Sequence, residues 1–246
     1  MQTMRGKRKP LIVGSALDSG DIENVRSLAQ AITGAVDGLK LGLEFFTAHG
    51  PDGIREIAKL GLPIFLDVKL HDIPNTVAGA IRSLAPLAPY YLTLHAGGGE
   101  AMLRAARATA YEEAARLSLT PPRLLAVTVL TSLDRGDLSD LGFECDVSEL
   151  VVSRARRAVV HGCAGVVASG QEAALLRREL GNTLLVVVPG IRPVDNQDDQ
   201  KRTVSAEQAL RDGADYLVVG RPIRDANDPK AAAEQIQEEI YQTVTS

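Results

Sequence analysis

The sequence contains few residues of the kinds that mark secreted, metal-binding or nucleic-acid-binding proteins. Its two cysteines, Cys145 and Cys163, form no CxxC pair and predict reduced thiols rather than a disulfide framework. The four histidines lack HxxxH spacing, so we expect no metal site. A net charge of −4, 4% aromatic residues and no tryptophan offer neither the basic surface nor the stacking platforms that nucleic acid requires. We therefore expect no nucleic-acid partner.

Long apolar segments are also missing. No stretch approaches the roughly 18 consecutive apolar residues of a membrane helix, and the N-terminus has no signal-type apolar region. We therefore expect no membrane partner and a cytoplasmic location. Arg5 to Lys9 include four basic residues before Pro10, and we interpret residues 1–9 as a solvated basic N-terminal tail.

The remaining composition is that of one globular domain. The chain has 246 residues, of which 45% are hydrophobic and 24% charged. No Gly/Ser-rich or Pro-rich linker divides residues 10–246, and this length suits a single α/β barrel.

Apolar, β-branched runs alternate with segments of helical periodicity along the whole chain. The expected strands are 11–17, 38–41, 64–69, 91–95, 124–130, 165–168, 184–189 and 216–219. The expected helices are 21–33, 51–60, 77–84, 99–115, 147–160, 171–180 and 205–212. Continuous apolar strands favour a parallel sheet covered by helices, and eight such units predict a closed (β/α)8 TIM barrel. A doubly wound open sheet is the main alternative, although the GxGxxG turn typical of many such folds is absent after the first strand.

Charged residues lie at the end of the third expected strand and just after it, in the run from Phe65 to Thr76, FLDVKLHDIPNT. Alternate strand residues share a face, so Asp67 and Lys69 should point the same way, into the barrel. Burying such a pair costs several kcal/mol per ion unless it is well compensated, which favours chemistry over stability as its reason. A purely structural ion pair remains the alternative.

Further polar residues lie in or after other expected strands, where barrel enzymes build their sites. They are Asp18, Lys40, His95, Thr131 and Ser132. Taken singly, Asp18 and Lys40 have structural explanations that are equally good, and His95 could be a hydrogen-bonded core histidine.

A phosphate site is predicted by the last two strands. Gly220 would allow close approach of the backbone, and Arg221 supplies a bidentate fork. The seventh strand leads into Pro189-Gly190-Ile191-Arg192-Pro193, and the polar segment 194–202 could close as a lid.

The chain resembles the orotidine 5′-phosphate decarboxylase family of the bacterial type. The resemblance rests on motifs spread over nearly the whole chain, and D-x-K-x-x-D-I-P-N-T together with G-I-R-P is its most specific part. The motifs are ALD at 16–18, LKLG at 39–42, FLDVKLHDIPNT at 65–76, VTVLTS at 127–132, PGIRP at 189–193, DQ at 199–200 and GRP at 220–222. The resemblance implies decarboxylation of orotidine 5′-monophosphate to UMP, the last step of de novo pyrimidine synthesis, without cofactor or metal, in a homodimer with shared active sites.

Residue roles are implied only by this resemblance. The charged tetrad would be Lys40, Asp67, Lys69 and Asp72, with Lys69 protonating C6, Asp67 beside the departing carboxylate and Asp72 reaching into a second subunit. The residues expected to contact substrate are Asp18, Lys40, Asp67, Ile73, Thr76, Thr131, Ser132, Pro189, Arg192, Gln200, Gly220 and Arg221.

Two other functions remain open at this point. D-x-K-x-x-D alone would also fit a sister, metal-dependent decarboxylase of a sugar phosphate such as 3-keto-gulonate phosphate. A non-catalytic protein that binds a phosphorylated ligand would keep the barrel and Arg221, although the intact Lys69 argues against it.

Overall fold

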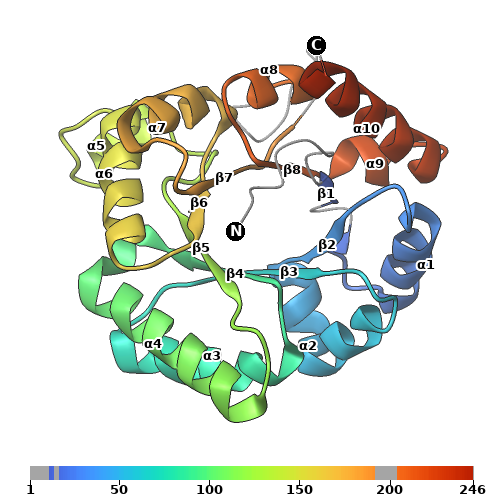
Figure 1. Ribbon diagram of the computed structural model, residues 1–246, viewed down its shortest axis with the longest axis horizontal. Coiled ribbons are helices and arrows are strands. Elements are labelled where there is room, and N and C mark those ends of the chain that lie inside the picture. Colours follow the sequence, from blue (N-terminus) through green and yellow to red (C-terminus); the bar gives the residue numbers. More distant parts are fainter. Residues whose placement is uncertain (1–10, 14–16, 192–203, 246) are drawn as a thin grey trace.

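Eight parallel strands form a closed barrel in the computed structural model, which describes residues 11–13, 17–191 and 204–245 (Figure 1). Each strand pairs with the next along the chain, and β1 pairs with β8, Leu11 lying opposite Leu217. The strands are β1 (Leu11–Val13), β2 (Gly38–Leu41), β3 (Ile64–Leu70), β4 (Tyr91–His95), β5 (Arg123–Val127), β6 (Gly165–Val167), β7 (Leu185–Val188) and β8 (Tyr216–Val219). The predicted barrel is confirmed; the expected tail, residues 1–9, lies outside the described residues.

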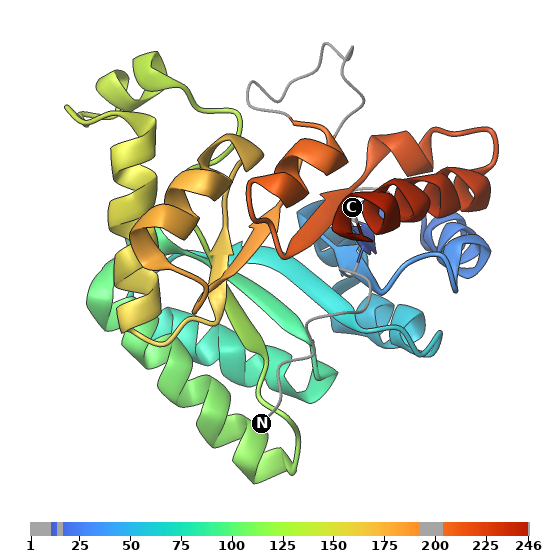
Figure 2. The same cartoon turned by 45° about the horizontal axis from the view of Figure 1, so that its top comes forward.

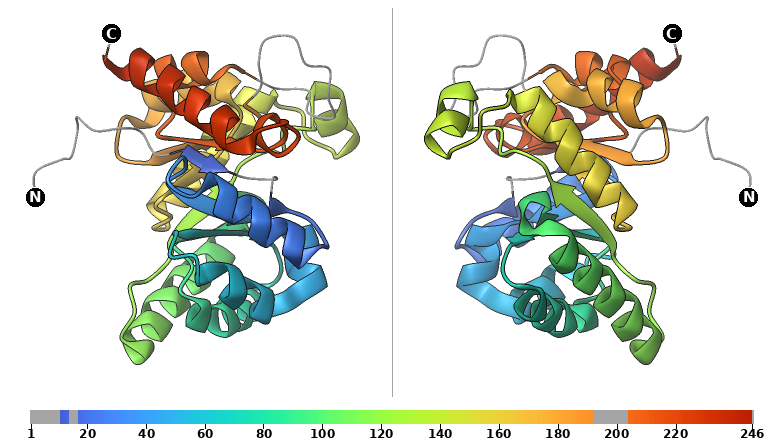
Figure 3. Two further views of the ribbon diagram at one scale, coloured as in Figure 1. Left: turned by 90° about the vertical axis from the view of Figure 1, so that its right-hand side faces the viewer. Right: turned by 90° about the vertical axis from the view of Figure 1, so that its left-hand side faces the viewer.

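Helices connect the strands and surround the barrel, as the turned views show (Figures 2 and 3). The α-helices are α1 (Ile22–Ile32), α2 (Leu43–Ala58), α3 (Pro74–Leu84), α4 (Gly99–Leu117), α5 (Arg135–Asp140), α6 (Val147–Val160), α7 (Ala173–Leu180), α8 (Ala206–Arg211), α9 (Arg221–Arg224) and α10 (Pro229–Thr245). Short 3-10 turns are η2 (Ala85–Leu87), η3 (Ala96–Gly98) and η4 (Gly170–Glu172). No helix in the described part of the chain combines the length and apolar character needed to cross a bilayer.

The structure corrects several expected boundaries. Helix α2 begins at Leu43, eight residues before the expected start, and continues through Gly50, whose φ of 58° breaks the helical geometry just before Pro51. The Gly-Pro pair therefore forms a kink between two helical segments, whereas the sequence predicts that a single helix begins at Pro51. Helices α5, α9 and α10 were not expected, and β5 ends at Val127 rather than at residue 130.

The alternation of side chains along the strands divides the core in two. Side chains on the outer face pack against the helices in a large cluster that includes Leu39, Leu41 and Leu66. Side chains on the inner face form a smaller cluster inside the barrel, which includes Phe65 and Tyr91. Because Phe65 faces inward, the side chain two residues later on β3 is directed to the mouth of the barrel.

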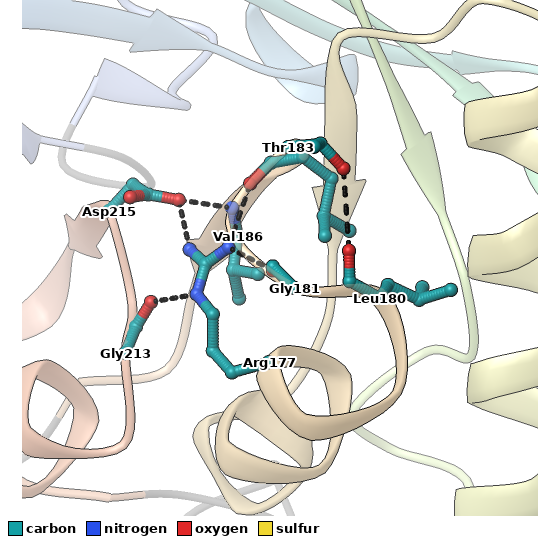
Figure 4. A network of polar contacts seen from close by, with 8 residues as sticks. Arg177, Leu180, Gly181, Thr183, Val186, Gly213 and Asp215 are labelled. Carbon is teal, nitrogen blue, oxygen red and sulfur yellow. Dashed lines mark hydrogen bonds and ion pairs between the residues drawn. The ribbon is translucent and has the colours of Figure 1, made fainter. Parts of the chain in front are cut away.

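One arginine connects the N-terminal ends of β7 and β8 (Figure 4). Arg177, on α7, donates hydrogen bonds of 2.8 Å to the carbonyl oxygens of Gly213 and Leu184 and pairs with Asp215. The carboxylate of Asp215 also accepts a 2.8 Å hydrogen bond from the backbone N–H of Val186. These contacts lie at the ends of the strands opposite the mouth and stabilise the frame that carries the site.

Candidate active site

Strand β3 departs from regular geometry at its charged residues. Leu66 and Leu70 are four residues apart, yet their partners on β4 are two residues apart, so the strand bulges between them. Within the bulge Lys69 has a φ of 48°, a left-handed conformation that costs energy for a residue with a side chain. Asp67 and Lys69 do converge, as the sequence predicts, but through a bulge rather than through the regular alternation on which that prediction rested.

Three charged side chains meet at the mouth of the barrel. One oxygen of the Asp67 carboxylate, Oδ2, lies 2.8 Å from Lys69 Nζ and 3.0 Å from Lys40 Nζ, which comes from β2. The side chains of Asp67 and Lys40 are 11% and 10% exposed, whereas that of Lys69 is 30% exposed. The cluster therefore presents one partly accessible ammonium in front of a buried ion pair.

The electrostatics of the cluster keep Asp67 ionised. Burial alone would raise the pKa of Asp67, but the ammonium groups of Lys40 and Lys69 outweigh it and hold this pKa well below its usual range. Two ammonium groups and one carboxylate leave a formal excess of one positive charge. The mouth can therefore stabilise negative charge that develops on a ligand.

Thr93 is a site residue that the sequence did not reveal. Its hydroxyl donates a 2.9 Å hydrogen bond to Asp67 Oδ1 and accepts a 2.9 Å hydrogen bond from the backbone N–H of Lys69. The residue is completely buried on β4. Threonine is common in strands, so only its position two residues before His95, on the same strand face, could have drawn attention to it.

A cavity of about 180 Å³ adjoins the charged cluster. Lys40, Asp67 and Lys69 lie on its wall, and much of the remaining lining is apolar. The other lining residues are Phe65, Val127, Val129, Leu130, Thr131, Val167, Ala168, Pro189, Gly190, Val218 and Gly220. The predicted residues Thr131, Pro189 and Gly220 are thus brought together with the charges.

Asp18 has a structural contact of its own. Its Oδ1 accepts a 3.0 Å hydrogen bond from the backbone N–H of Phe45, in the first turn of α2. Gly42, the N-cap of that helix, has no side chain to cap it, and an added Cβ would lie 2.1 Å from Asp18 Oδ2. Asp18 therefore caps α2 from the segment that follows β1, as an N-cap side chain would, and is not among the residues that line the cavity.

The remaining residues of the β3–α3 segment do not join the cluster within this chain. Asp72, Ile73 and Thr76 are exposed, and the side chain of Asp72 accepts a 2.7 Å hydrogen bond from the backbone N–H of Ile73. Among the described residues Asp72 makes no ion pair with Lys40 or Lys69. Three of the four predicted tetrad residues therefore meet in one chain.

The other predicted contact residues lie at the rim or outside the described part of the chain. Ser132 is exposed in the loop after β5, and Arg221 follows Gly220 as the first residue of α9. Arg192, Gln200 and the expected lid 194–202 lie outside the described residues.

His95 lies beside a second histidine near the mouth. Its ring stacks on that of His71, with centroids 5.0 Å apart and an interplanar angle of 26°. Burial, assisted by the positive charges of His71, Lys69 and Arg154, lowers the pKa of His95 to about 4. His95 is therefore neutral near pH 7, and it is not among the residues that line the cavity.

The described residues contain no group of three His, Cys, Asp or Glu side chains arranged as metal ligands. The chemistry that this geometry offers is electrostatic: a fixed carboxylate, a buried ammonium and a more accessible ammonium that can supply a proton.

Comparison with known proteins points to one family. Residues 10–236 match the model of the orotidine 5′-phosphate decarboxylase / HUMPS family. The orotidine 5′-phosphate decarboxylase of Rhodospirillum rubrum is 48% identical over 227 residues, which cover 92% of this chain and 92% of that protein. The one from Sphingopyxis alaskensis is 50% identical over 223 residues, 90% of this chain and 96% of the relative. The crystal structure of orotidine 5′-phosphate decarboxylase from Lactobacillus acidophilus superimposes with a TM-score of 0.82 at 35% identity, covering 95% of this chain and 99% of the other.

Proposed function

Because this chain belongs to the orotidine 5′-phosphate decarboxylase / HUMPS family, we propose that it decarboxylates orotidine 5′-monophosphate to UMP, the final step of de novo pyrimidine synthesis, without metal or organic cofactor. The observation that carries the proposal is the cluster of Lys40, Asp67 and Lys69, which adjoins a partly apolar cavity at the mouth of the barrel. Both cysteines are free thiols, which supports a cytoplasmic location as part of the proposal.

Lys69 would act on the reacting carbon. Loss of carbon dioxide breaks the bond between C6 and its carboxylate and leaves the electron pair on C6, where no ring carbonyl conjugates well with it. Preorganised positive charge is the suitable stabiliser for such a carbanion. The Lys69 ammonium would stabilise this charge and then transfer a proton from Nζ to C6, and it is the more exposed of the two lysines in the cluster.

Asp67 would lie beside the departing carboxylate. It is held ionised, so it would repel the substrate carboxylate and not the neutral carbon dioxide that forms. The apolar cavity wall, which includes Val127 and Val167, would act in the same direction, because leaving water disfavours a carboxylate far more than a neutral molecule. Asp67 would also orient Lys69, which it contacts at 2.8 Å.

The remaining site residues would hold the nucleotide. Lys40 would reach the ribose hydroxyls together with Asp18. Thr131 and Ser132 would lie near the pyrimidine. The residues proposed for the phosphate side are Pro189, Arg192, Gln200, Gly220 and Arg221.

A second copy of the chain would complete each site. Asp72, Ile73 and Thr76 are all exposed, and Ile73 remains 67% exposed although it is apolar. Burying this apolar side chain against a second copy would be favourable. We therefore propose a homodimer in which this segment reaches the partner's cavity. Mixing Lys69→Ala chains with Asp72→Ala chains should restore partial activity, and no recovery at all would contradict the shared site.

The function itself is tested by a spectrophotometric assay. The purified chain, treated with EDTA, should consume orotidine 5′-monophosphate, followed by its ultraviolet absorbance. Lys69→Ala should lose nearly all of this activity. Lys59→Ala, which removes a lysine at the C-cap of α2 whose side chain is 70% exposed, should keep it. Absence of turnover by the wild-type chain would overturn the proposal, and turnover of a sugar phosphate only with Mg²⁺ would indicate the sister activity.

A further inference from the structure

Resting on the proposed function, we infer that Thr93 is a positioning residue that couples the backbone of Lys69 to the carboxylate of Asp67 and so fixes the direction of the catalytic ammonium. Its hydroxyl lies between the two groups, 2.9 Å from each.

The direction of these hydrogen bonds follows from the donors available. The backbone N–H of Lys69 can only donate, so Thr93 Oγ1 accepts there. The single hydroxyl proton is then free to be donated to Asp67 Oδ1. The chain of contacts therefore runs from Lys69 N–H through the Thr93 hydroxyl to the Asp67 carboxylate, and the residue at its centre, Thr93, is completely buried.

The two oxygens of the Asp67 carboxylate have different partners. Oδ1 accepts from Thr93, whereas Oδ2 accepts from both ammonium groups. With Oδ1 held, the carboxylate cannot rotate without breaking a hydrogen bond, so Oδ2 stays directed toward Lys69 Nζ. The hydroxyl therefore determines where the ammonium rests.

The same hydroxyl stabilises an unfavourable backbone. Lys69 has a φ of 48° inside a bulge, a conformation that is maintained only where its surroundings determine it. Without the acceptor on Thr93, the N–H of Lys69 would lose its partner and the bulge could relax. A small backbone rotation at Lys69 would move its ammonium away from C6, and displacements of about 1 Å at reacting groups can lower rates 100-fold.

The experiment replaces Thr93 with residues that differ in this hydroxyl. Thr93→Val keeps the shape and removes both hydrogen bonds, so kcat should fall about 10- to 100-fold, as expected for hydrogen bonds to a charged group. The affinity for UMP, measured by calorimetry, should change less than about threefold, because no proposed phosphate contact involves Thr93. Thr93→Ser restores a hydroxyl and should return kcat to within about threefold of the wild type.

A second buried threonine provides the control. Thr109 lies on α4 in the helical layer, 6% exposed, and Thr109→Val should leave kcat unchanged. If Thr93→Val does not fold, Thr93→Ala carries the same expectation. A kcat for Thr93→Val within threefold of the wild type would overturn the inference, as would a Thr93→Ser variant as slow as Thr93→Val. An inactive wild-type chain would instead refute the proposed function.

Discussion

Replacing Asp67 with Asn should lower the free energy of unfolding by about 3–5 kcal/mol, because it leaves two ammonium groups beside each other without their carboxylate. Lys40 Nζ and Lys69 Nζ lie 3.0 and 2.8 Å from Asp67 Oδ2. At an effective dielectric constant of about 20, each contact is worth roughly 5–6 kcal/mol before the cost of desolvation. Asparagine keeps an oxygen that can accept from Thr93, so the substitution tests the charge and leaves the shape nearly unchanged.

A matched surface pair provides the control for this prediction. Asp52 contacts Arg55 Nη1 at 2.6 Å, but its side chain is 93% exposed, so Asp52→Asn should cost only about 0–1 kcal/mol. Urea denaturation at one chain concentration compares the two variants, at about 0.15 M and about 1 M NaCl, and only the surface pair should weaken with salt. Losses that agree within about 1 kcal/mol would refute the argument from burial. Adding Lys69→Met to Asp67→Asn should recover part of the loss, because it removes one unpaired ammonium.

Three further predictions concern other parts of the frame. Gly42→Ala should destabilise the protein by about 1–3 kcal/mol, because its Cβ would lie 2.1 Å from a carboxylate oxygen. In thermal melts Gly79→Ala should be neutral or stabilising, because nothing beyond its chain neighbours and its own helix backbone lies within 4 Å of the new Cβ. The pKa of His95, measured by NMR, should lie near 4 and should rise in His71→Ala. Since the unfolded chain binds this proton more tightly than the folded one, the free energy of unfolding should fall as the pH is lowered from about 6.5 toward 4, by at most about 1.4 kcal/mol per pH unit. His95→Asn should remove this contribution to the pH dependence. Arg177→Ala should cost about 3 kcal/mol without changing kcat, and an Arg177→Lys variant as stable as the wild type would show that the guanidinium fork is not needed.

The fold could be predicted because its pattern repeats. Each buried parallel strand is a short apolar run, and all eight runs were recognisable without any knowledge of their contacts. The errors occurred where a local signal had a second explanation. Gly50-Pro51 is typical of a loop before a helix, yet it kinks a longer helix, and α10 is a largely polar helix whose buried side is narrow.

The site could be predicted in its charges and less well in its geometry. Lys40, Asp67 and Lys69 are recognisable because charged residues rarely occupy buried strands. Thr93 was missed because its role depends on a bulge in the neighbouring strand, and no pattern in one strand reports the register of the next. The ligand contact expected of Asp18 stays a prediction, whereas its link to the first turn of α2 was missed because it depends on how that helix approaches the segment after β1.

The irregular features of this barrel are concentrated at one strand end. Of the residues that the structure describes, three with side chains have positive φ; Ala88 and Ser118 end helices, where that conformation is common, and Lys69 alone lies in a strand. The same few residues of β3 also contain a register shift and a carboxylate buried against two ammonium groups. Each feature is unfavourable by itself, and apolar residues in a regular strand would give a barrel at least as stable. Because local rules are broken together mainly where function requires it, this clustering supports, independently of any similarity to other proteins, the proposal that the reaction takes place at this end of the barrel.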